Sequence, residues 1–384
     1  MRCTSRPGRH AGSWCGAALI AAAAALLPLS ASAQTVAAPG GGDSKLDYAN
    51  ARAMALPMAP VAPVAPEDLP PARRAQAQAT GEAAFVPGQA GNGRKSPVQL
   101  AVAANAAAAN GGQVTPQEFG SAGQPFTTAR VNLRGDVTVD QYPYSAAGKL
   151  FFKIGADTFL CSGSLIKPGI VVTAAHCVTE FGTRQFYHGW RFVPAYNNGR
   201  APYGVWSVAK ARVVAAYFNG TDSCAVPGVV CRNDVAVLRL NPQGGAYPGP
   251  RTGTLGYAIN GYSYNRSGQV LVKQLGYPVG LDFGLLMQQT DAQGFVAVAS
   301  SDNTVIGSAQ NGGSSGGPWV VNFGVPPIMT GTSFGTAAQR NIVVGVTSWG
   351  FVDTAVKQQG ASRFTSTNIQ ALVNAECAAA PAAC

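Results

Sequence analysis

The chain has 384 residues, of which only 11% are charged, and it carries a formal net charge of +10. So few charged side chains exclude a charge-rich coiled coil or a polyelectrolyte tail. The 47 glycines and 26 prolines indicate many turns but fall short of a wholly low-complexity chain. With 47% hydrophobic residues, the chain can build one large core or two smaller ones.

The basic excess is scattered along the chain. Its densest groupings are Arg73-Arg74 and Arg94-Lys95, and neither is interleaved with aromatic residues. Nucleic-acid binding requires a basic patch or stripe rather than a mere excess of Lys and Arg. We therefore expect no nucleic-acid partner.

Residues 1–33 have the features of a secretory signal peptide. Three arginines precede an apolar run from Ala17 to Leu29, and the small residues Ala31-Ser32-Ala33 follow it. An apolar run of about 13 residues is too short to cross a bilayer, which takes about 20. The sequence predicts an exported protein without a membrane span, and it leaves open whether the protein stays in a periplasm or leaves the cell.

Residues 34–130 are rich in Ala, Pro and Gly. Pro and Ala alternate over residues 57–66, which favours extended chain, and the Ala-rich tract around residues 101–109 lacks large apolar side chains that could anchor a core. We interpret the segment as a propeptide or a linker, and composition alone does not separate these two roles.

After Arg130 the chain consists of short runs rich in Val, Ile, Phe, Tyr and Thr, separated by Gly, Pro and Asn. Such runs predict an all-β sandwich or barrel. Only the end has a helical pattern, with N-cap candidates in Thr365–Asn368 and apolar residues spaced as on a helix after them. The predicted strands are 149–154, 169–174, 206–216, 235–240, 269–275, 294–299, 318–322 and 342–348.

Eight cysteines become six once the signal peptide is removed, and an even set in an exported protein indicates disulfides. Pairing neighbours in the sequence is the simplest arrangement, although other connectivities stay open. That arrangement joins Cys161 to Cys177, Cys224 to Cys231, and Cys377 to Cys384.

A histidine follows an apolar run in the motif Thr173-Ala174-Ala175-His176-Cys177. An imidazole at the end of a strand can project into a cleft, where it can accept and return a proton. A lone histidine in this position is more often structural, so the motif by itself leaves both interpretations open.

An aspartate enters an apolar strand at Asn233-Asp234, ahead of Val235 to Leu240. Burying a carboxylate there requires dedicated donors, such as an imidazole N–H and backbone amides. The alternative is an ordinary turn aspartate that caps the preceding loop.

A glycine-rich loop, Asn311-Gly-Gly-Ser-Ser-Gly-Gly-Pro318, contains two adjacent serines. A serine hydroxyl is a weak nucleophile, so it needs a base in contact and a tight turn whose N–H groups converge on the developing oxyanion. The glycines permit such a turn, although a merely flexible loop has the same composition.

Together these motifs resemble those of the chymotrypsin-like (trypsin-like) serine peptidases. TAAHC, NDVAVLRL and GSSGGP are similar to the family's histidine, aspartate and serine motifs and stand in the family's order. Residues 161–166 are similar to the strand before the histidine, and Ser348-Trp349-Gly350 to the strand that lines the substrate. The resemblance covers about Tyr142 to Cys377.

The resemblance implies an all-β fold of two six-stranded antiparallel Greek-key barrels, with the active site in the cleft between them. Residues 131–255 would form the first barrel, with the histidine and the aspartate. Residues 256–384 would form the second barrel, with the serine and a short C-terminal helix.

The resemblance also implies roles for individual residues. His176 is the general base and then the general acid, Asp234 orients the imidazole, and Ser315 attacks the carbonyl. Ser315 is chosen over Ser314 because it directly precedes the Gly-Gly-Pro sequence. The backbone N–H groups of Gly313 and Ser315 form the oxyanion hole. The implied activity is that of a cofactor-free serine endopeptidase with an acyl-enzyme intermediate.

One departure concerns activation. Many animal members have an Asp just before the nucleophile, which receives the new N-terminal ammonium after cleavage, whereas this chain has Ser314. We therefore predict that no such ion pair activates the protein, and that any latency comes from residues 34–130 blocking the cleft. Gly276-Tyr277-Pro278 and the stretch that follows are more similar to secreted bacterial members, including glutamyl endopeptidases.

The family's spacing also implies a specificity pocket. Ala309 stands at its base, where trypsin-type enzymes have Asp, and Thr347 stands where glutamyl-specific members have His. A neutral, partly polar lining favours a small or apolar residue before the scissile bond. The substrate-binding candidates are Ala309, Gln310, Thr347, Ser348, Trp349 and Gly350, with Ser362 nearby.

Two other features are interpreted as structural. His188 and His176 are eleven residues apart with no cluster of Cys or carboxylates, so we expect no metal site and a structural or surface role for His188. Trp190, Trp206 and Trp319 are interpreted as core or barrel-surface residues rather than as ligand platforms.

The sequence leaves two alternatives to a general serine endopeptidase. One is a glutamyl-specific or otherwise narrow-specificity endopeptidase, and the other is a secreted binding protein on a protease-like scaffold. We expect the partners to be protein or peptide substrates, and we expect the protein to be a monomer.

Overall fold

The computed structural model describes residues 33–42, 45–60, 83–102, 124–132, 137–265, 268–298, 302–325 and 339–384. The chain divides into two units, Met1–Ser32 and Ala33–Cys384, and only the second is described below. Apart from Ala33, the predicted signal peptide therefore lies outside the described residues, as do most of the Pro-Ala alternation and of the Ala-rich tract.

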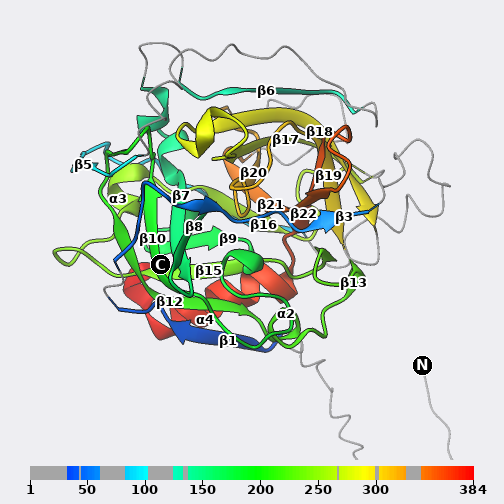
Figure 1. Ribbon diagram of the computed structural model, residues 1–384, viewed down its shortest axis with the longest axis horizontal. Coiled ribbons are helices and arrows are strands. Elements are labelled where there is room, and N and C mark those ends of the chain that lie inside the picture. The colour runs from blue at the N-terminus through cyan, green and yellow to red at the C-terminus, as the bar shows by residue number, and fades with distance from the viewer. Residues whose placement is uncertain are drawn as a thin grey trace, which may run out of the picture. The chain divides into compact units, whose positions relative to one another are not determined.

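The first of two closed barrels has six strands, which follow the order β12-β10-β7-β8-β9-β15 (Figure 1). β15 pairs back with β12 and closes the barrel, and every neighbouring pair is antiparallel. The strands are β7 (Ala147–Ile154), β8 (Asp157–Lys167), β9 (Ile170–Thr173), β10 (His188–Pro194), β12 (Trp206–Val214) and β15 (Ala236–Leu240).

The second barrel repeats this plan with the order β20-β17-β18-β19-β22-β21, closed by antiparallel pairing of β20 with β21. The predicted all-β double barrel is confirmed. Its strands are β17 (Gln269–Gly276), β18 (Gln288–Val298), β19 (Asn303–Gly307), β20 (Pro318–Val321), β21 (Ile342–Phe351) and β22 (Gln358–Arg363), and β16 (Gly256–Ile259) runs parallel to β21.

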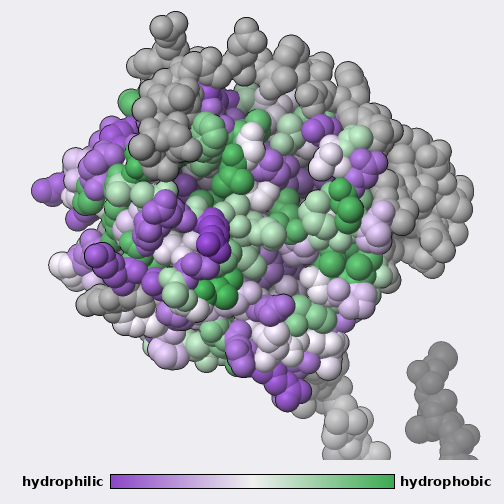
Figure 2. All heavy atoms as spheres, in the orientation of Figure 1, coloured by the Kyte–Doolittle hydropathy of each residue, from purple (hydrophilic) through white to green (hydrophobic). Residues whose placement is uncertain are grey.

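Shared apolar packing fixes the two barrels against each other. The largest cluster of buried side chains combines first-barrel residues such as Val172 and Leu238 with Val320, Val343 and Val346 of the second barrel. Each of the three tryptophans expected in the core or on the barrel surface is fully buried. The face in Figure 2 mixes hydrophilic and hydrophobic residues without one large patch of either kind.

The N-terminal segment adds short strands to the barrels. β1 (Thr35–Pro39) pairs with β12, and β6 (Phe126–Arg130) pairs with β18 along the upper edge of Figure 1. The Ala-rich composition does not predict this, because backbone pairing with a strand edge needs no large side chain. The other strands of the segment are β2 (Arg52–Ala53), β3 (Met58–Ala59), β4 (Ala84–Val86) and β5 (Val98–Gln99).

The C-terminal helix α4 (Ala371–Ala379) follows the second barrel in sequence but packs on β12 and β15 of the first. Thr365 and Asn368 form a reciprocal capping box at the start of η8 (Ser366–Gln370), the turn that leads directly into α4. No helix in the described residues is long and apolar enough to cross a membrane. The remaining elements are η3 (Thr138–Asp140), η4 (Tyr144–Ala146), η5 (Ala175–Cys177), β11 (Arg200–Ala201), α2 (Ala215–Asn219), β13 (Cys224–Val226), β14 (Val230–Cys231), α3 (Gly249–Thr252), η6 (Asp282–Gly284), η8 (Ser366–Gln370) and η9 (Pro381–Ala383).

A buried carboxylate fastens α4 to the first barrel. Glu376 is fully buried, and it accepts hydrogen bonds from Arg212 Nε at 2.7 Å and Arg239 Nε at 2.9 Å.

We expect Glu376→Ala to lower the free energy of unfolding by about 3 kcal/mol, because two mostly buried guanidinium groups lose their partner. Chemical denaturation measures the change, and Asn374→Ala, at an exposed position of α4, is the matched control. Equal stabilities of the two variants would contradict the assignment.

Candidate active site

A disulfide and a short 3-10 turn place His176. The residue lies in η5, directly after β9, and the neighbouring Cys177 is bonded to Cys161 of β8 with a Cα–Cα distance of 6.3 Å. The bridge fixes the turn against the adjacent strand, so the imidazole has a defined position. The other two disulfides also join sequence neighbours, Cys224 to Cys231 and Cys377 to Cys384.

Asp234 meets that imidazole inside the protein. Its Oδ2 lies 2.8 Å from His176 Nδ1, and its Oδ1 accepts the backbone N–H of His176 at 2.8 Å. Ser348 Oγ, from β21 of the second barrel, donates to Oδ2 at 2.6 Å. The side chain of Asp234 is 1% exposed, so these donors replace the water that burial removes.

The loop before Asp234 is held by a second carboxylate. Asp222 accepts the backbone N–H of Asn233 at 2.8 Å and its side-chain N–H at 2.6 Å. Burial raises the pKa of Asp222, and the hydrogen bonds from Asn233 work in the opposite direction. Burial also raises the pKa of Tyr187 to about 12, with Glu180 and Asp234 adding to the effect.

Glycines bring the serine turn against the histidine strand. Gly316 has φ +76°, and a Cβ built on it would lie 2.0 Å from Thr173 Oγ1 of β9, so a larger residue does not fit. Ser315 is fully buried and His176 is 4% exposed. Ser315 Oγ and His176 Nε2 are both buried without a hydrogen-bond partner in the described structure.

Ser162 fastens this turn to β8. Its backbone N–H donates to the carbonyl of Ser315 at 2.7 Å, and its hydroxyl donates to the carbonyl of Gly313 at 2.8 Å. The N–H of Gly313, a predicted oxyanion-hole donor, lies 3.2 Å from the carbonyl oxygen of Met54. In the described structure, the N–H of Gly313 is thus already hydrogen-bonded to a residue of the N-terminal segment.

The predicted pocket residues divide into two groups. Ala309 is half-buried, while Gln310 and residues 347–350 are buried. Ser348 supports Asp234 in addition to its place on the predicted substrate strand. The hydroxyl of Thr347 is engaged inside the second barrel, where it accepts from Gln274 Nε2 at 2.8 Å and Trp319 Nε1 at 2.9 Å.

Sequence reasoning missed the buried polar network behind the pocket. Gln359 Nε2 donates to the carbonyl of Gln310 at 2.9 Å, and Ser308 Oγ donates to Gln274 Oε1 at 2.7 Å. Gln310 Nε2 donates to Thr290 Oγ1 at 3.1 Å. These contacts are formed by amide and hydroxyl groups alone. The only sign of the network in the sequence is a glutamine within runs that otherwise have a strand-like pattern.

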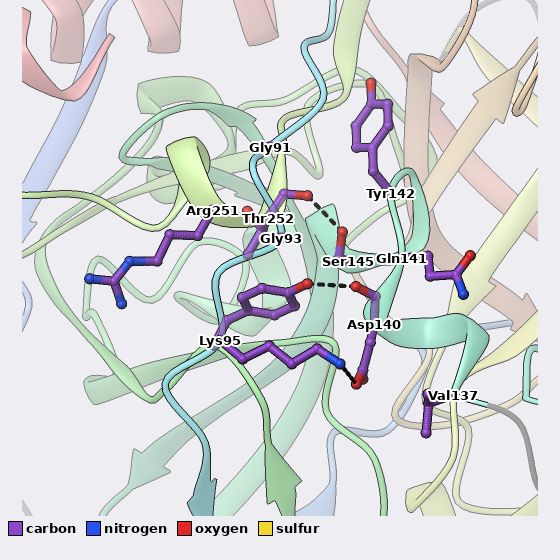
Figure 3. Close-up of a pocket in the computed structure, with 11 residues that line it drawn as sticks. Gly91, Gly93, Lys95, Val137, Asp140, Gln141, Tyr142, Ser145, Arg251 and Thr252 are labelled. Carbon is purple, nitrogen blue, oxygen red and sulfur yellow. Dashed lines mark hydrogen bonds and ion pairs between the residues drawn. The ribbon is translucent and has the colours of Figure 1, made fainter.

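A cavity of about 280 Å³ lies at a different place and contains none of the predicted catalytic residues (Figure 3). At its wall, the buried Asp140 binds Lys95 Nζ at 2.7 Å and Arg200 at 2.8 and 2.9 Å. These ion pairs tie the stretch around Lys95 in the N-terminal segment to the chain that leads into the first barrel.

The described residues contain two clusters of side chains of metal-ligating type, Cys161 with His176 and Cys177, and Asp222 with Cys224 and Cys231. All four cysteines are in disulfides, so they offer no thiolate to an ion. His188 begins β10 with an exposed side chain and belongs to neither cluster.

The first barrel thus carries a carboxylate-bound imidazole, and the second barrel carries a serine on a glycine turn. The trypsin family model matches residues 136–369, which is more than half of the chain. The chain therefore belongs to the trypsin family.

Similar proteins were found among curated and solved proteins. The chain is 28% identical over 157 residues to an extracellular metalloprotease of Bacillus subtilis, and 46% identical over 54 residues to the clotting factor G beta subunit of Tachypleus tridentatus. These matches cover 39% and 14% of this chain, and only 44% and 16% of the relatives' own lengths. The crystal structure of protease Anisep from Arthrobacter nicotinovorans is 24% identical, with a TM-score of 0.48 over 61% of this chain and 96% of that one.

The position of Thr347 generates a stability prediction. Thr347→Val keeps the volume but removes the acceptor for two buried N–H donors, so we expect the free energy of unfolding to fall by about 2 kcal/mol. Thr183→Val, at an exposed hydroxyl, should change it by less than about 0.5 kcal/mol. Urea denaturation of both variants tests this, and an unchanged Thr347→Val protein would show that the hydroxyl is not used inside the barrel.

Proposed function

We propose that the protein is an exported serine endopeptidase that cleaves protein substrates through an acyl-enzyme. The observation that carries this proposal is the arrangement Ser348–Asp234–His176, which supports the imidazole while His176 Nε2 and Ser315 Oγ remain without partners. A nucleophile and a base that are buried but unpartnered are available to a substrate.

In the proposed reaction, Ser315 Oγ attacks the carbonyl carbon of the scissile peptide bond and its proton passes to His176 Nε2. The carbonyl oxygen becomes an oxyanion, which accepts the N–H groups of Gly313 and Ser315. The C–N bond breaks as Nε2 returns the proton to the leaving amine. Water then attacks the acyl ester with the same imidazole as base, which releases the acid product and restores Ser315.

Asp234 has two tasks in this scheme. It accepts the Nδ1–H of His176, which leaves Nε2 as the basic nitrogen, and its charge stabilises the imidazolium that forms. Ser348 is a positioning residue because its hydroxyl fixes Oδ2, the oxygen that faces Nδ1.

The pocket residues set the direction of the substrate. Ala309, Gln310 and residues 347–350 would receive the residue before the scissile bond, so the N-terminal half of a substrate lies along β21. The C-terminal half then continues past Ser315 towards β8. The neutral amides and hydroxyls around Gln310 and Thr347 favour a small or apolar side chain in the pocket.

Export is supported by the three disulfides, which form in oxidising compartments. We further propose that the enzyme acts as a monomer and without a cofactor, and that nucleic acid is not a partner. The scattered positions of its basic residues support the last point.

The nucleophile can be tested with two adjacent serines. A fluorophosphonate reagent should label the full chain and Ser314→Ala, incubated until labelling stops increasing, but not Ser315→Ala. The reason is that only Ser315 sits beside His176 in the proposed scheme. Intact-mass spectrometry measures the label. Equal labelling of the two alanine variants, or none of the wild type, contradicts the assignment.

The specificity can be tested on a peptide library. We expect preferred cleavage after small or apolar residues, because the described pocket residues Ala309, Gln310 and Thr347 carry no charge. Mass spectrometry of the products identifies the cleavage sites, with Ser315→Ala as the blank. Dominant cleavage after Glu would favour the glutamyl-specific alternative, and dominant cleavage after Arg would also overturn the prediction.

A further inference from the structure

A short stretch of the N-terminal segment, residues 52–59, crosses the proposed substrate cleft and contacts both of its walls. β2 (Arg52–Ala53) pairs with β8, where Ala53 lies opposite Leu160. β3 (Met58–Ala59) pairs with β21, where Met58 lies opposite Gly350. Figure 1 shows β3 beside β21 and β22, far in sequence from both.

Between these two pairings, Met54 occupies the centre of the site. Its N–H donates to the carbonyl of Leu160 at 2.9 Å, and its carbonyl accepts the N–H of Gly313 at 3.2 Å. A Cβ built on Gly312 would lie 3.2 Å from the same carbonyl oxygen, so the segment passes close over the serine turn. Met54 thus uses a donor that a substrate carbonyl needs.

Beyond Met54, the segment uses the backbone of β21. The carbonyl of Pro57 accepts the N–H of Gly350 at 2.9 Å, and the carbonyl of Ala59 accepts the N–H of Val352 at 3.0 Å. The side chain of Leu56 is buried, and its Cδ1 lies 3.6 Å from the position of a Cβ on Gly350. The segment therefore takes the place of the N-terminal half of a substrate.

The direction of the segment is the opposite of the direction proposed for a substrate. Both pairings are parallel, so the chain enters along β8 and leaves along β21. A substrate would enter along β21 and leave towards β8. If Ser315 attacked the carbonyl of Met54, the leaving nitrogen would be that of Ala55, on the β21 side. His176 belongs to the other wall, so it is poorly placed to protonate that nitrogen.

We propose that residues 52–59 are a built-in inhibitor that binds the active site in reverse and keeps the enzyme latent while it is docked. This inference rests on the proposed serine endopeptidase function. The stretch from Met54 to Ala59, Met-Ala-Leu-Pro-Met-Ala, is apolar and uncharged, which matches the neutral groups behind the pocket. Reversal explains how a segment can fill the site without being cut.

The orientation is tested by cysteine cross-linking in the inactive Ser315→Ala full chain. Cysteines at Arg52 and Phe159, or at Met58 and Gly350, face each other as partners across strands, so each pair should form a disulfide. The swapped pairs, Arg52 with Gly350 and Met58 with Phe159, are the matched controls. Cross-linked peptides are identified by mass spectrometry after digestion. Cross-links in the swapped pairs, or in none, overturn the reverse orientation.

Latency is tested in the active full chain by introducing a carboxylate at buried positions of the segment and, as a control, at an exposed position. Leu56→Asp puts a carboxylate at a buried position, so it should undock the segment and raise the rate of fluorophosphonate labelling at least about tenfold. Pro60→Asp adds the same charge at an exposed position just after the segment and should leave the rate unchanged. Ala59→Asp, at a second buried position, should reproduce Leu56→Asp.

The two experiments separate the inhibitor from the enzyme. If cross-links form in the pairs that the structure shows, but the Leu56→Asp chain is never labelled, the docked segment is supported and the proposed peptidase is contradicted. A wild type that labels as fast as Leu56→Asp contradicts latency and leaves the peptidase standing.

Discussion

The buried carboxylate of Asp234 is the constraint on which the site depends. At 1% exposure, it has lost nearly all its water, and an ion in that position is tolerated only with several donors. These donors come from two places in the sequence: the backbone and ring of His176 in the first barrel, and the hydroxyl of Ser348 in the second. Satisfying one ion therefore requires that both barrels are folded and packed together.

The serine turn is positioned by close backbone approach rather than by charge. Ser162 of β8 binds the carbonyls of Gly313 and Ser315, and Gly316 leaves no room for a side chain against Thr173. The turn belongs to the second barrel, where the N–H of Gly316 donates to the carbonyl of Thr347 at 2.8 Å, and it also contacts β8 and β9 of the first barrel. The two barrels are thus joined by hydrogen bonds at Asp234 and by hydrogen bonds at Ser162.

Sequence patterns predict those parts of the fold that local chemistry encodes. Runs of β-branched residues predict strands such as β9 and β21, and the double-barrel architecture follows from the resemblance and is confirmed. β22, with the sequence Gln-Gln-Gly-Ala-Ser-Arg, has no such signal, because its glutamines are stabilised by partners distant in sequence, such as Gln274. Similarly, β1, β2, β3 and β6 pair with barrel strands, β4 with β16 and β5 with β11, so all six depend on partners distant in sequence.

The candidate site shows the same division. The residues of the proposed triad lie in local motifs, so sequence alone proposes them, and the structure brings His176 and Asp234 into contact. The direction in which a strand side chain points depends on register, so sequence does not reveal that the hydroxyl of Thr347 is bonded within the barrel. The motifs also do not predict the position of Met54. Backbone hydrogen bonds hold it beside the serine turn, and any residue other than proline can make them.

Backbone recognition has a consequence for how such a cleft can be occupied. The N–H groups of Gly313 and Gly350 donate to any carbonyl, whichever way the chain runs, so these donors alone do not distinguish a substrate from a reversed peptide. In the proposed reaction, proton transfer does distinguish them, because the leaving nitrogen must face His176. A chain bound in reverse can keep much of the binding energy without being cleaved. In this proposal, the direction of the chain rather than its composition therefore separates an inhibitor from a substrate.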